Sequence, residues 1–128
     1  MLSLPFLGKL HKGQCLNKEN VVEQMAVPTY LKPQRNSFII QVDGDSMRGS
    51  GILDRDFLVI SPHNTANNND IVLATIDNIE TVIKHFEQTN DLIFLNSLNS
   101  EIKPMIFDPS RIKILGIVNG QMRSYESS

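Results

Sequence analysis

The chain has 128 residues, of which 41% are hydrophobic and 20% are charged, and its formal net charge is −2. This length suffices for one hydrophobic core and leaves little room for a second domain. The slightly negative charge argues against an electrostatic surface for nucleic acid, so we expect no direct DNA binding. No apolar stretch approaches the ~20 residues that span a bilayer, and the N-terminus lacks the apolar core of a secretory signal. We therefore expect a cytoplasmic protein that does not contact a membrane.

The N-terminal segment, residues 1–20, contains one proline, two glycines and charges of both signs, which is typical of an extended arm. Its apolar side chains between Leu2 and Leu7 either dock on an apolar surface or form a first strand of the core. Nothing before Ser37 has the length or periodicity of a helix-turn-helix unit. Helical turns are indicated only at residues 17–25 and after Ser46, where Ser46 is expected to cap the turn.

Six runs rich in β-branched and aromatic residues predict strands, and turn clusters at residues 67–70 and 89–91 separate some of them. The runs are residues 37–42, 57–61, 71–76, 81–86, 92–95 and 112–118. The fold class is therefore mainly β. The last run is either a strand that pairs across a dimer or a part of the core.

Ser46 follows the first of these runs, and Lys84 lies within the fourth. Both side chains can take part in catalysis. The run 37–42 predicts a strand, and a Gly-Asp turn then places Ser46 at its end. Strand alternation puts Lys84 on one face with Val82 and Phe86. Apolar surroundings lower the pKa of a lysine because they remove water from the ammonium, and a neutral lysine can take the proton of a serine hydroxyl. The pair indicates a Ser-Lys catalytic dyad.

Simpler interpretations of both residues remain. A Gly-Asp-Ser turn is common because Asp and Ser bond nearby backbone, and a single strand lysine is often a surface residue with its stem on apolar neighbours. His85 offers a Ser-His-Asp triad instead. Alternation, however, puts His85 and Lys84 on opposite faces, so at most one of them reaches Ser46.

The remaining reactive side chains are scattered. Cys15 is the one cysteine, which excludes an internal disulfide. His11 and His63, like the third histidine, have no cysteine or carboxylate at a ligand spacing, so we expect no metal and no cofactor. Asp45 is interpreted as a turn residue, because a carboxylate beside a lysine that must be neutral would favour the charged lysine.

Four segments agree jointly with one family in order and separation. They are residues 44–47 (GDSM), 51–60 (GILDRDFLVI), 69–74 (NDIVLA) and 81–84 (TVIK). The chain thereby resembles the LexA/UmuD family of self-cleaving serine peptidases, peptidase family S24, from about Leu7 to the strand at 112–122. The resemblance implies a single compact domain of curled antiparallel sheets with an extended N-terminal arm. We assign residues 1–30 to the arm and residues 31–128 to the β domain.

The resemblance also implies roles for individual residues. Ser46 is the expected nucleophile and Lys84 its base, while the backbone N–H groups of Ser46 and Met47 are expected to hold the oxyanion. Family members cut their own chain between a small residue and a glycine upstream of the serine. Gly13 aligns with that glycine, which makes Lys12-Gly13 the expected cleavage site.

Three positions depart from the family pattern. Arg55 replaces the glycine of an Asp-Gly-Asp turn, and a positive φ there would strain it. Asn69 replaces another glycine, a milder change because asparagine tolerates a left-handed conformation. Lys12 replaces the small residue before the cut, so a long cationic side chain must enter a pocket shaped for a methyl or a thiol, at a cost in fit and desolvation.

The expected partners follow from the resemblance alone. They are a second copy of the chain, the RecA–single-stranded DNA filament that stimulates self-cleavage in the SOS response, and a UmuC-like Y-family DNA polymerase in translesion synthesis. The polymerase is expected because the chain looks UmuD-like, with a short arm in place of a DNA-reading domain. Two hypotheses stay open: a self-cleaving peptidase of the DNA-damage response, and a non-cleaving homodimeric module that serves a polymerase or acts as an anti-repressor partner of LexA-like repressors.

Overall fold

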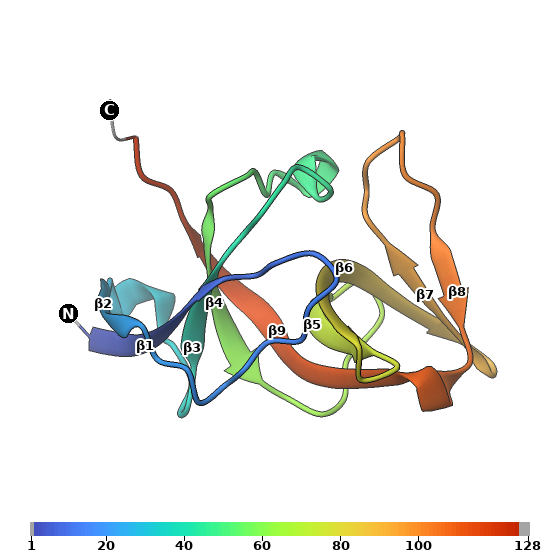
Figure 1. Cartoon of the computed structure of the whole chain (residues 1–128), viewed down its shortest axis with the longest axis horizontal. Helices are drawn as coiled ribbons and strands as arrows, with labels where there is room; N and C mark the ends of the chain where they lie inside the picture. Colours follow the sequence, from blue (N-terminus) through green and yellow to red (C-terminus); the bar gives the residue numbers. More distant parts are fainter. Residues whose placement is uncertain (1, 126–128) are drawn as a thin grey trace.

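The computed structural model describes residues 2–125, which build one open sheet of nine strands (Figure 1). The strands are β1 Leu2–Lys9, β2 Glu23–Val27, β3 Phe38–Gln41, β4 Phe57–Pro62, β5 Ile71–Ile76, β6 Glu80–Thr89, β7 Leu92–Asn96, β8 Met105–Phe107 and β9 Ile112–Met122. Three short 3-10 helices in the described part are η1 Thr29–Leu31, η2 Arg48–Ser50 and η3 Pro109–Arg111. No described helix has the length and apolar character needed to cross a membrane.

The strand order across the sheet is β2-β1-β3-β4-β9-β5-β6-β7-β8. Neighbouring strands run antiparallel, except that β1 and β3 run parallel. The mainly β, single-domain prediction is confirmed, and every strand run expected from the sequence forms a strand. The run 71–76 coincides with β5, while β6 and β9 extend beyond the predicted bounds.

Three strands, β1, β2 and β8, lie outside the six runs that predicted strands. The apolar N-terminal run forms β1, which lies between β2 and β3, so its first-strand interpretation is the one that holds. β2 overlaps residues 17–25, where a helical turn was expected, and that prediction is wrong for residues 23–25. Val27 at the end of β2 is fully buried in a cluster with Ile39 and Val59. Tertiary packing of this kind outweighs weak local propensity.

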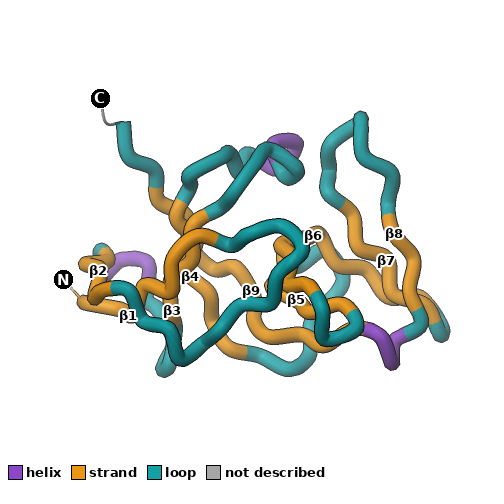
Figure 2. The backbone as a smooth tube through the Cα atoms, viewed as in Figure 1, coloured by secondary structure: helices purple, strands orange, loops and turns teal. Residues whose placement is uncertain are grey.

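β9 is the central, bent strand that joins the two halves of the sheet (Figure 2). Its C-terminal half pairs with β4 and its N-terminal half with β5, and the register of both ladders shifts once. Gly116 lies at the crossover, where a Cβ would stand 2.7 Å from the carbonyl oxygen of Ser61. β4 and β9 therefore approach more closely than a side chain at this position allows.

Two larger clusters of buried side chains form most of the core. The first contains Leu7, Phe38, Ile40, Val42, Met47, Ile52, Leu58, Ile60, Leu73 and Ile83. The second contains Val72, Ala74, Ile76, Phe86, Ile93, Leu95 and Phe107. The first cluster includes Met47 from the turn that carries Ser46, so the packing of the core anchors that turn.

Candidate functional site

Ser46 lies in the turn between β3 and η2, where it is half-buried. Gly44 has a φ of 97°, which the turn requires. Two hydrogen bonds close the turn: Gly44 N donates to Asp54 Oδ1 at 2.7 Å, and Asp54 N donates to Asp45 Oδ1 at 3.2 Å. Met47 is only 2% exposed and anchors the turn in the first core cluster. The expectation that Ser46 caps the helix is wrong, because Met47 occupies the cap and makes no side-chain cap bond.

Two backbone amides lie beside the hydroxyl, those of Ser46 and Met47. Within residues 2–125 neither Ser46 N–H nor Met47 N–H has an acceptor, whereas the next amide, Arg48 N, donates to Asp45 O at 3.1 Å. Two adjacent, unengaged N–H groups at a nucleophile are the donors that an oxyanion requires. The turn therefore has the donors expected of an oxyanion hole.

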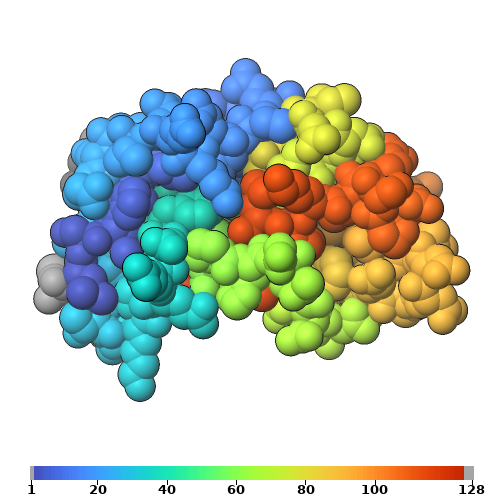
Figure 3. Space-filling view, turned by 90° about the horizontal axis from the view of Figure 1, so that it is seen from below, coloured from blue at the N-terminus to red at the C-terminus, as the bar shows by residue number. Residues whose placement is uncertain are grey.

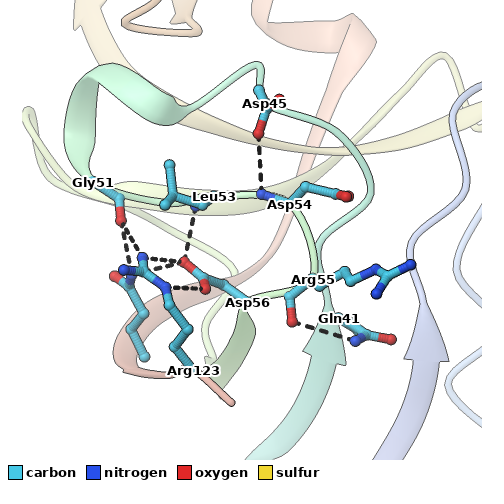
Figure 4. Close-up of polar contacts among 9 residues, drawn as sticks. Gln41, Asp45, Gly51, Leu53, Asp54, Arg55, Asp56 and Arg123 are labelled. Carbon is cyan, nitrogen blue, oxygen red and sulfur yellow. Dashed lines mark hydrogen bonds and ion pairs between the residues drawn. The ribbon is translucent and has the colours of Figure 1, made fainter. Parts of the chain in front are cut away.

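An ion pair with a buried carboxylate fixes the other end of this turn (Figure 4). Asp56 is fully buried, and Arg123 donates to it from Nε at 2.7 Å and from Nη2 at 2.8 Å. Gln121 donates to the same carboxylate at 2.9 Å, and Leu53 N donates at 2.8 Å. The hydrogen bonds from Arg123 are the main reason that the pKa of Asp56 lies below its ordinary value. The end of β9 is thereby tied to the residues that follow Gly51.

Both unusual turn residues adopt the conformation that glycine would favour. Arg55 has a φ of 72° and Asn69 a φ of 78°. Arg55 therefore carries the strain expected of a non-glycine residue in this region. Its carbonyl accepts a hydrogen bond from Gln41 Nε2 at 3.2 Å, which helps to hold the strained peptide (Figure 4).

Lys84 is half-buried on β6, and its pKa lies below the ordinary value for lysine. Burial is the main cause; the nearby Lys12 ammonium lowers the pKa further, and the Glu80 carboxylate opposes both. Lys84 Nζ donates a hydrogen bond to Ser97 Oγ at 2.5 Å. Among residues 2–125, no hydrogen bond joins Lys84 to Ser46. Lys84 thus has a lowered pKa, and its amine is held by the hydroxyl of Ser97.

The segment with the expected cleavage site lies against the start of β6 (Figure 3). Gly13 N donates to Glu80 Oε2 at 2.8 Å. Thr81 N donates to Gln14 O at 3.0 Å, and Leu16 N donates to Thr81 Oγ1 at 2.9 Å. These three bonds hold the chain that follows the Lys12-Gly13 peptide next to the strand that carries Lys84.

Other candidate residues lie apart from this arrangement. Among the described residues, no three His, Cys, Asp or Glu side chains come together as a metal site. Cys15 is exposed and lines a groove of about 740 Å³ together with His63 and Lys113. Neither member of the dyad lines this groove. His85 is opposite Asn96 in the β6–β7 ladder, on the strand face that alternation assigns away from Lys84.

Sequence reasoning missed Ser97, Glu80 and Thr81. A signal for Ser97 was present, because the turn cluster at residues 89–91 is a hairpin in which Thr89 pairs with Leu92. Counting away from the turn along both strands, starting at that pair, places Ser97 opposite Lys84. Glu80 and Thr81 had no such signal, since their partners belong to a segment far away in the sequence.

Comparisons with known proteins identify the family of the chain. The sequence matches the family described as Peptidase S24-like over residues 5–119. It is 40% identical over 126 residues to the LexA repressor of Moorella thermoacetica, covering 98% of this chain and 60% of that protein. It is 35% identical over 124 residues to the LexA repressor of Clostridioides difficile, covering 96% and 59%. The chain thus spans about 60% of the length of these relatives. It belongs to the LexA/UmuD-like Peptidase S24 family.

Proposed function

We propose that the chain is a Ser-Lys serine peptidase that cuts its own Lys12-Gly13 bond. The docked arm is the observation that supports this most strongly. Gly13 N is held by Glu80 at 2.8 Å, and the Lys12 ammonium lies close enough to Lys84 to lower its pKa. The bond to be cut and the candidate base thus lie close together. In this proposal residues 1–30 carry the cleavage site and residues 31–128 carry the peptidase-like domain.

The first half of the reaction forms an ester. Neutral Lys84 takes the proton of Ser46 Oγ, which attacks the carbonyl carbon of Lys12. The N–H groups of Ser46 and Met47 hold the oxyanion that develops. Collapse of this intermediate breaks the carbon–nitrogen bond, and the protonated Lys84 returns the proton to the leaving amine of Gly13. Lys12 is then esterified to Ser46.

The second half of the reaction regenerates the hydroxyl. A water molecule attacks the ester carbonyl while Lys84 takes one of its protons, and the same two N–H groups hold the second oxyanion. Collapse returns the proton to Ser46 Oγ and releases residues 1–12 with a free carboxylate. No metal or cofactor is needed to balance either half.

The biological setting follows from family membership. We place the activity in the cytoplasm, in the SOS response to DNA damage, with stimulation by the RecA–single-stranded DNA filament and with a homodimer as the working unit. The UmuD-like interpretation adds a Y-family polymerase as the partner of the processed chain. LexA-like repressors are an alternative partner for the same dimer.

A second candidate function is a homodimeric binding module that keeps the dyad but does not cut. Lys12 is the observation that favours it, because a long cationic side chain stands where the family has a small one. The desolvation cost of burying that ammonium next to Lys84 opposes the productive geometry. The two functions differ in one measurable property, the covalent integrity of the chain.

Intact-mass measurement after incubation at neutral and alkaline pH, with and without RecA filament, separates these functions. The peptidase function predicts loss of residues 1–12 from the parent and no change in a Ser46→Ala variant. An unchanged parent mass under every condition would favour the binding module. The oligomeric state of both proteins, determined by analytical ultracentrifugation, tests the proposed dimer independently.

A further inference from the structure

Ser97 is the direct partner of the candidate base. Its hydroxyl accepts a hydrogen bond from Lys84 Nζ at 2.5 Å, and the residue is only 2% exposed. It follows β7 immediately, and the ladder in which His85 faces Asn96 brings Ser97 opposite Lys84. A buried hydroxyl with one strong partner is a fixed point rather than a mobile surface contact.

The direction of this hydrogen bond matters for the proposed chemistry. A neutral lysine amine has two N–H donors and one lone pair. When an N–H is donated to Ser97, the lone pair stays available to accept the proton of Ser46. A lysine free to rotate about its long stem would present the lone pair in many directions, at a cost in orientation. One bond to a buried acceptor restricts that rotation.

The residues after Ser97 contact the nucleophile turn. The carbonyl of Leu98 packs directly on Gly49, and Asn99 Nδ2 donates to Asp45 O at 3.2 Å. Arg48 Nη2 lies 3.6 Å from Glu101 Oε2. In Figure 1 the loop between β7 and β8 stands beside the turn that contains η2. One short segment, residues 97–101, therefore contacts both Lys84 and the turn that carries Ser46.

This segment also stores strain. Leu98 has a φ of 55°, a conformation that a branched side chain rarely adopts, and its N–H is held by Asn96 Oδ1 at 2.8 Å. Strained residues of this kind persist where the surrounding contacts enforce them, often next to functional groups. Here the strained peptide connects the residue that holds the base to the residues that hold the nucleophile turn.

We infer that Ser97 is a positioning residue, which orients the amine of Lys84 toward Ser46. Leu98, Asn99 and Glu101 hold the nucleophile turn at a fixed distance from it. The inference rests on the proposed peptidase function. Ser97 acts through Lys84 and does not touch the bond that is cut.

Rates of self-cleavage across pH test this role in four proteins: the parent, Ser97→Ala, the nearly isosteric Ser97→Cys, and Ser100→Ala, which alters an exposed serine of the same segment. We expect the plateau rate of both Ser97 variants to fall by about tenfold or more. The inflection of their pH–rate profiles should also move to lower pH, because the hydroxyl of Ser97, which accepts from Lys84, stabilises the charged lysine. Ser100→Ala should match the parent in both respects.

If the substitution instead disrupted the packing of the site, the inflection of the pH profile would move to higher pH. Water entering around Lys84 would raise its pKa toward the ordinary value. An inflection that moves to higher pH, or an unchanged plateau and inflection in Ser97→Ala, would overturn the inference. Thermal unfolding of each variant verifies that it is folded. If Ser97→Ala fails to fold, the Ser97→Cys protein decides alone, because it preserves the side-chain volume.

A second readout does not require cleavage. In the Ser46→Ala background, the ¹³Cε and ¹⁵Nζ resonances of Lys84 report its titration directly. Adding Ser97→Ala should lower the pKa of Lys84 relative to Ser46→Ala alone, and an unchanged pKa would contradict the inference. A parent that never cleaves would refute the proposed function, while this titration would still decide whether Ser97 holds the lysine.

Discussion

Gly49 packs directly against Leu98: a Cβ built on Gly49 would stand 1.6 Å from the Leu98 carbonyl oxygen. The two residues come from the nucleophile turn and from the segment that follows β7, so this contact sets the separation between the two halves of the site. Because the obstructing atom is backbone and not a flexible side chain, the contact cannot relax locally.

Gly49→Ala tests this contact. We expect it to push the nucleophile turn away from the 97–101 segment, to lower the free energy of unfolding by about 2 kcal/mol, and to reduce self-cleavage more than stability alone explains. Gly51→Ala is the matched control for a glycine of the same turn, since it has no atom within 4 Å of a built Cβ and strains only its own φ of 84°. Urea unfolding and cleavage rates of both variants provide the comparison.

Lys12→Ala should accelerate self-cleavage. The substitution restores a small residue before the cut, and it removes an ammonium that lowers the pKa of Lys84. The plateau rate should therefore rise, by about tenfold, while the inflection of the pH profile moves to higher pH. Lys113→Ala removes an exposed charge elsewhere and should change neither. A Lys12→Ala protein with an unchanged profile would show that Lys12 does not lie at the site.

Glu80→Gln should shift the pH profile of self-cleavage to lower pH, opposite to the shift expected for Lys12→Ala. The carboxylate of Glu80 raises the pKa of Lys84, so its neutralisation lowers that pKa and leaves more neutral lysine at a given pH. Glutamine keeps an oxygen that can accept from Gly13 N, which now bonds the carboxylate at 2.8 Å. Cleavage should therefore begin at a lower pH than in the parent. A shift to higher pH would argue against electrostatic control by Glu80.

Arg123→Leu should destabilise the chain because it leaves the buried carboxylate of Asp56 without its cation. We expect a clear loss of stability, moderated because Arg123 is itself 34% exposed. Arg111→Leu breaks the exposed pair with Asp77 and should cost less stability than Arg123→Leu, because solvent screens that pair. Urea unfolding at neutral pH measures both, and equal losses would mean that the burial of Asp56 carries no special weight.

The ion pair between Asp56 and Arg123 also predicts that the stability of the chain falls at acid pH. The pKa of Asp56 is lowered in the folded state from its ordinary value of 3.8. Its contribution to stability is therefore fully present above that ordinary value and is lost as the pH falls through the lower, folded-state pKa. In Asp56→Asn this acid-dependent part should be absent, so the difference in stability between parent and variant should shrink below about pH 4.

Substitution of two buried serines by alanine should change the stability of the chain in opposite directions. Ser37 is 1% exposed, and its hydroxyl has no partner within the described residues. Ser37→Ala should therefore stabilise the chain by up to about 1 kcal/mol. Ser61 is equally buried, but its hydroxyl donates to Gln34 Oε1 at 2.6 Å, so Ser61→Ala should cost about 1 kcal/mol. Thermal unfolding of the two variants decides whether hydrogen bonding distinguishes them.

Strands with strong β propensity were predictable from the sequence, and β5 was predicted to the residue. β1 was predicted only as one of two alternatives, because Pro5 obscures its pattern, and β2 was not predicted, because the charges near Glu23 obscure its pattern. Those strands form when Val27 and Leu7 reach buried partners that lie far along the chain. β8 has only three residues, too few to show alternation.

Some parts of the candidate site were likewise predictable from the sequence, and others were not. The turn with Ser46 and the strand with Lys84 each have a local signature, so they were predictable. The contacts that hold them were not, because Glu80 meets Gly13, and Leu98 meets Gly49, only after the sheet has curled. Long-range register of this kind depends on the whole set of strand pairings and not on any one segment.

The most direct test of the central claim is the mass of the products formed by the parent and by Lys84→Ala as the pH is raised. We predict two fragments in the parent, residues 1–12 and 13–128, at a rate that rises through the pKa of Lys84 and then levels off. Lys84→Ala should stay intact at every pH while keeping its fold. Cleavage of Lys84→Ala at the parent rate, or a cut at any other bond, would contradict the Ser-Lys account.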